Sequence, residues 1–152
     1  MASPQIDERF LQPLESMGLA LEMKEVPLLI LSEKDQWRFV QQITSILGGR
    51  GVYSGTADVT EQLLKSIKAP DYFFLMIEDT LPDKLTEVLR YYLDSRDILE
   101  PSSDAILQQK FRTQPIHSDH RLILLIDRDT LESQSSYMQM RLREICRVIA
   151  VS

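Results

Sequence analysis

Four short runs of large aliphatic and aromatic residues divide the chain, and none of them alternates with polar residues. Continuous apolar runs of this length are typical of parallel strands that are buried on both faces of a sheet. A weaker, fifth candidate strand is Gly51–Ser54. The four stronger candidates are Pro27–Leu31, Tyr72–Ile77, Leu122–Ile126 and Val148–Val151.

Amphipathic helix patterns fill the segments between these runs, with apolar residues recurring every three or four positions. An N-terminal helix is expected from about Ile6 to Glu25, although Pro13 weakens it. Asp35 is expected to cap the next helix, and Ser135 or Ser136 to open the last one. The residues expected to be apolar helix positions include Phe10, Leu11, Leu14, Met17, Leu21, Phe39, Val40, Ile43, Ile46, Leu63, Leu64, Ile67, Val88, Leu89, Tyr92, Tyr137 and Met140.

Strands that alternate with helices predict an α/β fold. We expect a three-layer sandwich with a mostly parallel, Rossmann-like sheet of about five strands flanked by helices. The 152 residues suit a single domain, with an N-terminal helix at 1–25 and an α/β core at 26–152. The segment at about 99–119 is rich in Ser, Gln and Pro, and is either a functional loop or a flexible insertion.

The charge balance narrows the classes of partner. The chain has 17 basic and 23 acidic residues, for a formal net charge of -6. This balance argues against a general nucleic-acid or anionic-membrane binder, because both need a basic surface. We see no transmembrane run and no secretion signal. The single cysteine, Cys146, permits no internal disulfide, which favours a cytoplasmic location.

Ligands of open α/β sheets gather at the carboxyl ends of the strands, and the first such end is "SEKDQWR", Ser32 to Arg38. A P-loop has glycines here so that backbone N–H groups can close on phosphates, and a Lys that reaches the outer phosphates. Aligned with that motif, Ser32 and Trp37 replace the glycines and Arg38 replaces the Lys. The stretch is therefore either a plain strand–helix turn or a phosphate site with non-standard chemistry.

Polar residues follow the later strands as well. Glu78 and Asp79 either hold Mg²⁺ or form a solvated turn before a helix. Asp127, Arg128 and Asp129 either sense a ligand or form a local ion pair at the surface. Two histidines in "HSDH", His117 and His120, are expected to be loop residues rather than zinc ligands, and Cys146 to be a small apolar residue. Arg141, Arg143 and Arg147 form one local basic cluster that suits an acidic partner.

These segments together resemble the AAA+ module of bacterial activators that act on the sigma factor sigma-fifty-four. "VPLLILSEKDQWR" is similar to the family's Walker A strand and loop, and "DHRLILLIDRDTLE" resembles its sensor strand. "RGVYSGT" resembles the loop with which the family contacts its sigma factor, which implies partner contacts at Gly51, Val52, Tyr53 and Ser54. The resemblance implies a vestigial nucleotide site at Ser32, Lys34, Trp37, Arg38 and Asp127.

The departures from the AAA+ pattern are as informative as the matches. The Walker A glycines and Lys are absent, and the Walker B acids fall on Met76 and Ile77. The family's second strand, between Ile46 and Arg50, is also missing in this alignment. The resemblance therefore implies the family's fold without its ATP hydrolysis.

A second resemblance is to the response-regulator receiver. "APDYFFLMIEDTLPDKLTEVLR" is similar to the receiver's phosphorylation strand, with Glu78 where the phosphorylated Asp would lie and Gly51–Ser54 as the second strand. Asp127 stands where that family has a hydroxyl, and Ser152 where it has a Lys. Strand order separates the two readings, because AAA+ modules have the order 5-1-4-3-2 and receivers 2-1-3-4-5.

Both resemblances predict a parallel α/β domain whose active site has been lost. The function that we expect is a catalytically inactive, AAA+-like regulatory or structural protein-interaction domain in a bacterial cytoplasmic assembly. Its partner is expected to be a protein, either an active AAA+ relative or a second copy, with no cofactor and no metal. The alternatives are a pseudo-receiver signalling domain and a nucleotide binder with a non-standard P-loop.

Overall fold

The computed structural model describes residues 7–47, 51–54, 59–78, 86–89, 92, 116–117 and 119–151. For Leu47, 51–54, 59–60 and Ile145 it describes the backbone alone. The helices are α1 (Glu8–Glu22), α2 (Glu33–Leu47), α3 (Val59–Ser66), α6 (Arg128–Ser133) and α7 (Ser136–Ile145). The strands are β1 (Pro27–Ile30), β2 (Gly51–Ser54), β3 (Tyr72–Ile77), β4 (Arg121–Ile126) and β5 (Arg147–Ala150).

The strands form one sheet in the order β2-β3-β4-β1-β5, and each neighbouring pair is parallel. The register is continuous across the centre, where Leu28 of β1 lies between Leu124 of β4 and Val148 of β5. Among the described residues, β2 and β5 are therefore the two edges of the sheet. The chain passes through α2 between β1 and β2, through α3 between β2 and β3, and through α6 and α7 between β4 and β5, as parallel pairing requires.

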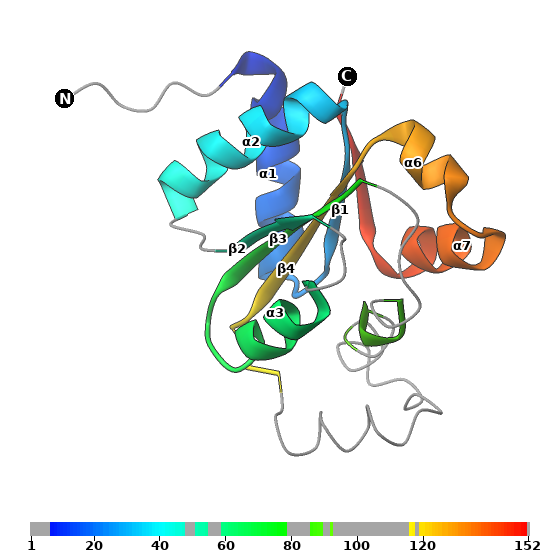
Figure 1. Cartoon of the computed structure of the whole chain (residues 1–152). Helices are drawn as coiled ribbons and strands as arrows, with labels where there is room; N and C mark the ends of the chain where they lie inside the picture. The colour runs from blue at the N-terminus through cyan, green and yellow to red at the C-terminus, as the bar shows by residue number, and fades with distance from the viewer. Residues whose placement is uncertain are drawn as a thin grey trace.

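Both faces of the sheet are covered by helices, as Figure 1 shows. Alternate strand residues such as Phe74, Met76 and Leu125 join one core cluster with Phe10 and Met17 of α1 and with the apolar stripe of α2. The intervening strand residues join a second cluster on the opposite face, with apolar side chains of α3 and α7: Leu28, Phe73, Leu75, Leu122, Leu124, Leu63, Ile67, Met138 and Leu142. Burial on both faces explains why the strand sequences are continuously apolar.

The predicted α/β class with a parallel sheet is confirmed. The five predicted strands agree with the observed ones to within one residue at each end, including the weak candidate Gly51–Ser54. The helix α6 was missed because its six residues are too few to show a period. The expected loop at about 99–119 lies outside the described residues except for 116–117 and 119.

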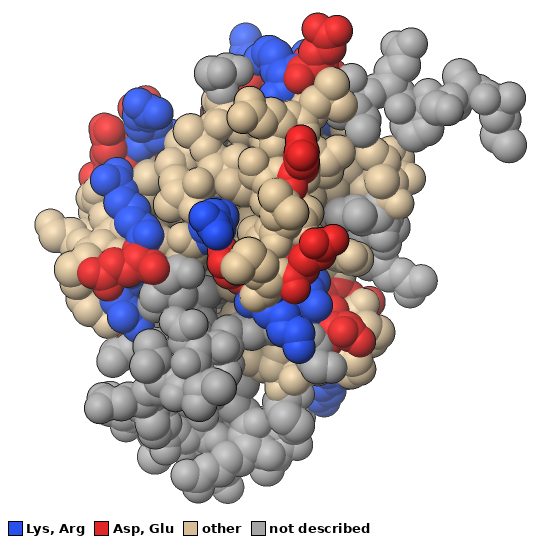
Figure 2. Space-filling model, turned by 180° about the vertical axis from the view of Figure 1, so that it is seen from behind, with Lys and Arg blue, Asp and Glu red and all other residues tan. Residues whose placement is uncertain are grey.

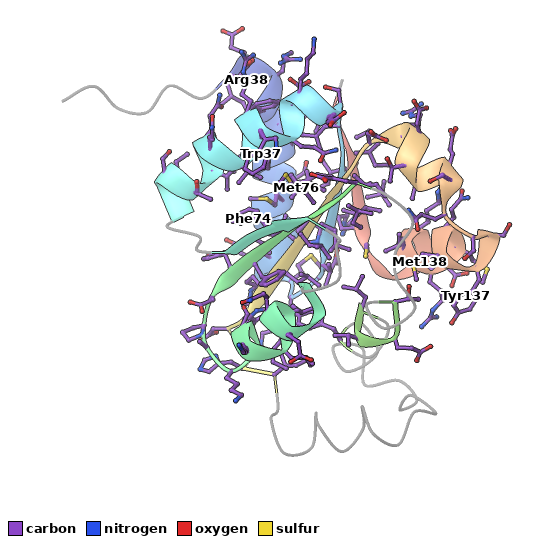
Figure 3. The ribbon with its side chains drawn as sticks, viewed as in Figure 1. Trp37, Arg38, Phe74, Met76, Tyr137 and Met138 are labelled. Atoms are coloured by element: carbon purple, nitrogen blue, oxygen red, sulfur yellow. The ribbon has the colours of Figure 1, made fainter. Side chains whose placement is uncertain are left out.

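Some of the expected inward positions are wrong. Leu11 of α1 is 51% exposed and Ile46 of α2 is 45% exposed, so the apolar stripes of these helices are narrower than expected. Tyr137 and Met140 of α7 also lie on the surface, whereas Met138 and Leu142 provide the buried face. Figure 3 shows the contrast between Met138, directed toward the sheet, and Tyr137, directed away from it.

The helix α1 ends three residues earlier than expected. Lys24 adopts a left-handed conformation with φ 61°, its N–H donates to the Leu21 carbonyl, and the Glu25 N–H donates to the Ala20 carbonyl. This is the Schellman arrangement, in which glycine normally occupies the left-handed position. No glycine marks the stop in the sequence, and the turn sends the chain directly into β1.

Candidate functional site

A pocket of about 320 Å³ lies at the carboxyl ends of the central strands. It is at the position where α/β sheets place their ligands, beside the point at which the chain leaves β1 for the far edge of the sheet. The lining residues come from the ends of β1, β4 and β5 and the turns that follow them: Ile30, Leu31, Ser32, Glu33, Asp127, Arg128, Asp129 and Val151.

The connection from β1 to α2 is too short to surround a phosphate. Only Leu31 and Ser32 separate the strand from the helix, which begins at Glu33. The Ser32 carbonyl accepts from the Asp35 and Gln36 N–H groups, each at 3.0 Å, and its Oγ lies 3.4 Å from the Asp35 N. The predicted cap at Asp35 is therefore wrong, because Ser32 is the residue before the helix, and both its carbonyl and its side chain accept the Asp35 N–H.

Gln36 closes the inner side of this turn. Its side chain is only 3% exposed, and its Nε2 donates to the Leu31 carbonyl at 3.4 Å. A P-loop leaves space here for backbone to approach phosphate. The buried amide of Gln36 lies beside the turn and satisfies the Leu31 carbonyl, the first one after β1.

Three of the residues expected in a vestigial nucleotide site do not line the pocket. Lys34 and Trp37 are on the exposed side of α2, and Trp37 is 52% exposed. Arg38 is directed along α2 toward the start of α1, where its Nη1 lies 3.5 Å from Asp7 Oδ2 (Figure 3). The P-loop alignment does not correspond to the structure, because α2 begins at Glu33, five residues before Arg38.

Arg38 belongs to a charged network that joins the first turns of α1 and α2. Arg9 makes a bidentate pair with Asp35, at 3.1 and 3.0 Å, and its Nη2 lies 3.5 Å from Asp7 Oδ2. The hydrogen bonds from Arg9 lower the pKa of Asp35, and the Arg9 backbone N–H lowers that of Asp7. The same pairs raise the pKa of Arg9, the Asp35 hydrogen bond first. These charges hold two helices together outside the pocket.

Asp127 does line the pocket, but it is also the N-cap of α6. Its Oδ1 accepts from the Thr130 N–H at 2.6 Å, and its backbone is extended, as an N-cap requires. The predicted local ion pair with Arg128 is not among the ion pairs that the structure describes. Asp127 therefore has a structural role that explains an aspartate at this strand end without a ligand.

The charge of the pocket opposes a nucleotide. Three carboxylates, those of Glu33, Asp127 and Asp129, line it together with one guanidinium, that of Arg128. Phosphate sites need an excess of positive charge or a nest of free N–H groups. The single positive charge of Arg128 is outnumbered by three negative charges, so a phosphate would be repelled.

The other candidate sites are separate. Glu78, after β3, is exposed, and Asp79 lies outside the described residues. Among the described residues, no cluster of three or more His, Cys, Asp or Glu side chains is arranged to hold a metal ion. Burial raises the pKa of the Cys146 thiol to about 12, so this cysteine is an unreactive core residue as expected.

Both histidines lie outside the helices and strands, as expected, but His120 is a core residue and not a surface one. His120 is fully buried, and its Nε2 and Nδ1 lie 2.8 Å from Ser66 Oγ and 2.9 Å from Tyr92 Oη. Its polar contacts join α3, the helical residue Tyr92 and the start of β4 at the amino ends of the strands. His117 is half-buried, and its Nδ1 accepts from the Asp119 N–H at 3.0 Å.

The residues expected to contact a partner lie in two places. Gly51, Val52, Tyr53 and Ser54 form β2 and pair with β3, so they do not form the loop that the AAA+ resemblance implied. Arg141 and Arg143 lie on α7, the first half-buried and the second exposed. Arg147 of β5 pairs with Glu25, with Nε 2.8 Å from Oε2.

Comparison with known proteins gives no family. No protein-family model matches the chain. No curated protein matches it either. The helices that the structure describes include none with the length and apolar character needed to cross a membrane.

A larger groove, of about 570 Å³, lies between α1 and the edge strand β5. Sequence reasoning missed it because the last apolar run was expected to be buried on both faces. In β5 only Ile149 is buried, and Arg147, Val148 and Ala150 are exposed. The groove is lined by these four residues and by one side of α1: Arg9, Gln12, Pro13, Ser16, Leu19, Ala20 and Met23.

Proposed function

We propose that this chain is a catalytically inactive, AAA+-like domain that works by protein–protein contact in a bacterial cytoplasmic assembly. The observation that carries the proposal is the two-residue turn from β1 to α2, which leaves no loop to surround a phosphate and in which Ser32 already accepts the Asp35 N–H. The acidic lining of the pocket points in the same direction. A domain with an intact core and no phosphate cradle is best explained by a binding role.

The sheet order supports an AAA+-like layering over the receiver alternative. Read from β5, the order is 5-1-4-3-2, which is the order that the AAA+ resemblance implies. A receiver would place β1 next to β2, whereas here β1 lies between β4 and β5. The pseudo-receiver therefore becomes the weaker proposal. A buried free thiol is compatible with the reducing cytoplasm.

Titration calorimetry with ATP, ADP and GTP, each with and without Mg²⁺, tests the inactive site. We expect no binding at millimolar nucleotide. Micromolar binding that is lost in Arg128→Ala and kept in the off-pocket control Arg38→Ala would establish the alternative, a nucleotide binder with a non-standard site. Arg128 is the observation that favours this alternative, because it is the one cation among the residues lining the pocket.

A protein partner is then required by the proposal. An active AAA+ relative and a second copy of the chain both suit an inactive module, because such modules act by completing or restraining an assembly. Sedimentation of the purified chain distinguishes a self-associating protein from one that needs another partner. The mixed surface charge gives no support to a nucleic-acid partner: blue and red groups are interspersed on the face shown in Figure 2.

A further inference from the structure

The groove between α1 and β5 combines an open strand edge with exposed apolar side chains. Three of the eight large hydrophobic residues that are exposed in the described chain line it: Leu19 at 58%, Met23 at 65% and Val148 at 40%. Leu19 and Met23 supply its apolar wall, whereas Val148 supplies its strand edge, because the neighbouring Ile149 is the β5 side chain that packs on the α1 face. Leu19 and Met23 are one helical turn apart on α1, so they lie on the same side of the helix. The remaining exposed apolar residues do not line this groove.

The backbone of β5 presents hydrogen-bonding groups along the groove. The Arg147 N–H donates to the Val26 carbonyl and the Val151 N–H to the Ile30 carbonyl, each at 2.8 Å. In a parallel ladder alternate residues face the partner strand. The N–H and C=O groups of Val148 and Ala150 therefore face away from β1, and within the described residues β5 pairs with β1 alone.

The charge of the groove differs from that of the whole chain. Its lining includes the guanidinium groups of Arg9 and Arg147 and no carboxylate, in a chain of net charge -6. Both arginines have carboxylate partners outside the lining, and their side chains keep 44% and 51% of their surface exposed. These pairs use Nη1 and Nη2 of Arg9 and Nε and Nη2 of Arg147, so a ligand would be bonded by Arg9 Nε and Arg147 Nη1, for which the described residues include no partner.

We propose that this groove binds an extended segment of a partner protein in which apolar residues alternate with acidic ones. The segment adds a strand beside β5, with its backbone bonded to Val148 and Ala150 and alternate apolar side chains against Leu19 and Met23. Its acidic residues meet Arg9 and Arg147. This inference rests on the proposed protein-interaction role and gives that role its surface and its class of partner.

A second copy of the chain is a poorer occupant. A two-fold symmetric contact places the same patch on both sides of the interface. Pairing two copies of this groove would bring together four arginines, each already paired with a carboxylate of its own chain, and neither lining would supply a carboxylate for their remaining donors. A partner of opposite charge does not have this disadvantage.

The test uses the full chain and an array of fluorescent seven-residue peptides, in which Val or Leu alternates with Asp, Glu, Ser or Lys. We expect fluorescence anisotropy to detect micromolar binding of the Asp and Glu peptides, weakened at least tenfold when Lys replaces the acids. Hydrogen exchange of the Val148 and Ala150 amides should slow at saturating peptide. Absence of binding by the whole array, or preference for the Lys peptides, would overturn the proposal.

Three variants locate the site. Val148→Pro removes an outward N–H, Met23→Glu introduces a charge on the apolar wall, and both should weaken peptide binding at least tenfold. Leu11→Glu is the control, because Leu11 is an exposed apolar residue of the same helix outside the groove. Equal binding by all three variants would refute the site. If Val148→Pro fails to fold, Met23→Glu decides.

Self-association of the unmodified chain that is abolished by Val148→Pro would show that a second copy occupies the groove, contrary to the proposal. Failure of the peptide test leaves the nucleotide titration unaffected. If the chain binds neither peptide nor nucleotide, the proposed binding groove is refuted and the proposed inactive site is retained. If the chain binds nucleotide at micromolar concentration, the proposed function itself is refuted.

Discussion

The two concave regions of the molecule differ in what their polar groups already do. At the carboxyl ends of the strands, Ser32 accepts the Asp35 N–H at the start of α2, Gln36 bonds the Leu31 carbonyl, and Asp127 caps α6. Beside β5, the outward groups of Val148 and Ala150 have no strand partner among the described residues. The position that usually binds ligands is occupied by structural bonds, and an edge that usually needs protection is open.

The comparison teaches that location within a fold and chemical availability are separate properties. A polar residue at a strand end is free to bind a ligand only if the local backbone has not already taken its hydrogen bonds. Conversely, an edge strand has outward N–H and C=O groups without a strand partner wherever it lies in the fold. The β5 prolines and the Asp127 variants each change one of these regions, whereas the Lys24 and Asp35 variants change residues beside the groove that belong to the fold.

The largest effect is expected inside β5, from proline at adjacent positions. Ile149→Pro removes an N–H that faces β1 and a buried side chain, and should lower the free energy of unfolding by about 3 kcal/mol. Val148→Pro removes an outward N–H and should lower it by less than about 1 kcal/mol. Urea denaturation measures both. Similar losses for the two prolines would mean that the outer edge is not free.

The second prediction concerns the N-cap in the carboxyl-end pocket. Asp127→Ala should lower the free energy of unfolding by about 1 kcal/mol, because the Thr130 N–H loses its acceptor. Asp127→Asn keeps an acceptor oxygen and should retain most of that stability. Urea denaturation of the two variants compares them directly. An Asn variant as unstable as the Ala variant would show that the charge of Asp127, and not its capping bond, matters.

Lys24→Gly should increase stability. The left-handed backbone at Lys24 is unfavourable for a residue with a Cβ and acceptable for glycine, so we expect a gain of about 0.5 to 1 kcal/mol. Because Lys24 does not line the groove and glycine keeps the same backbone conformation, the variant should keep the peptide affinity of the groove. Thermal unfolding checks the gain, with Lys65→Gly, inside α3, as a control that should be destabilised. A loss in Lys24→Gly would contradict the assigned backbone conformation.

The smallest effect is expected from the charged network at the start of α1 and α2. The pKa of Asp35 is lowered in the folded chain, so its contribution is present above the unfolded value near 3.8 and is lost as the pH falls through the folded value. Asp35→Asn should therefore lower the Tm by about 2 °C or less at pH 7, and by progressively less as the pH falls through the folded pKa. A Tm difference that grows toward acid pH would reverse the sign and exclude this pairing.

Much of the fold was predictable because its strands are buried on both faces. The apolar runs of β1, β3 and β4 have no other explanation, and their lengths gave the strand boundaries to within one residue. The outer strand β5 was recognised as a strand but not as an edge, since apolar residues such as Val148 read the same whether covered or exposed. Periodicity also failed at the ends of helices, where Leu11 and Ile46 continue the apolar stripe into solvent.

The candidate site was predictable only in part. Ser32 and Asp127 do lie in one pocket, because parallel strands bring their carboxyl ends together. Trp37 and Arg38 do not, because matching seven letters to a P-loop assumes a loop, and a helix that begins at Glu33 rotates the later residues away. The role of His120 depends on Ser66 and Tyr92, two residues distant in sequence that no local pattern connects to it.

The position of β1 in the sheet has a consequence for how the chain folds. β1 comes early in the sequence, yet both of its neighbours, β4 and β5, belong to the last third of the chain. During synthesis its apolar residues leave the ribosome long before either neighbour exists. Contacts between distant segments form slowly, because a long loop must be closed first. Until then α1 and α2 are the only neighbours in sequence that can cover the apolar residues of β1. Early packing of these helices on β1 should therefore decide whether the nascent chain aggregates.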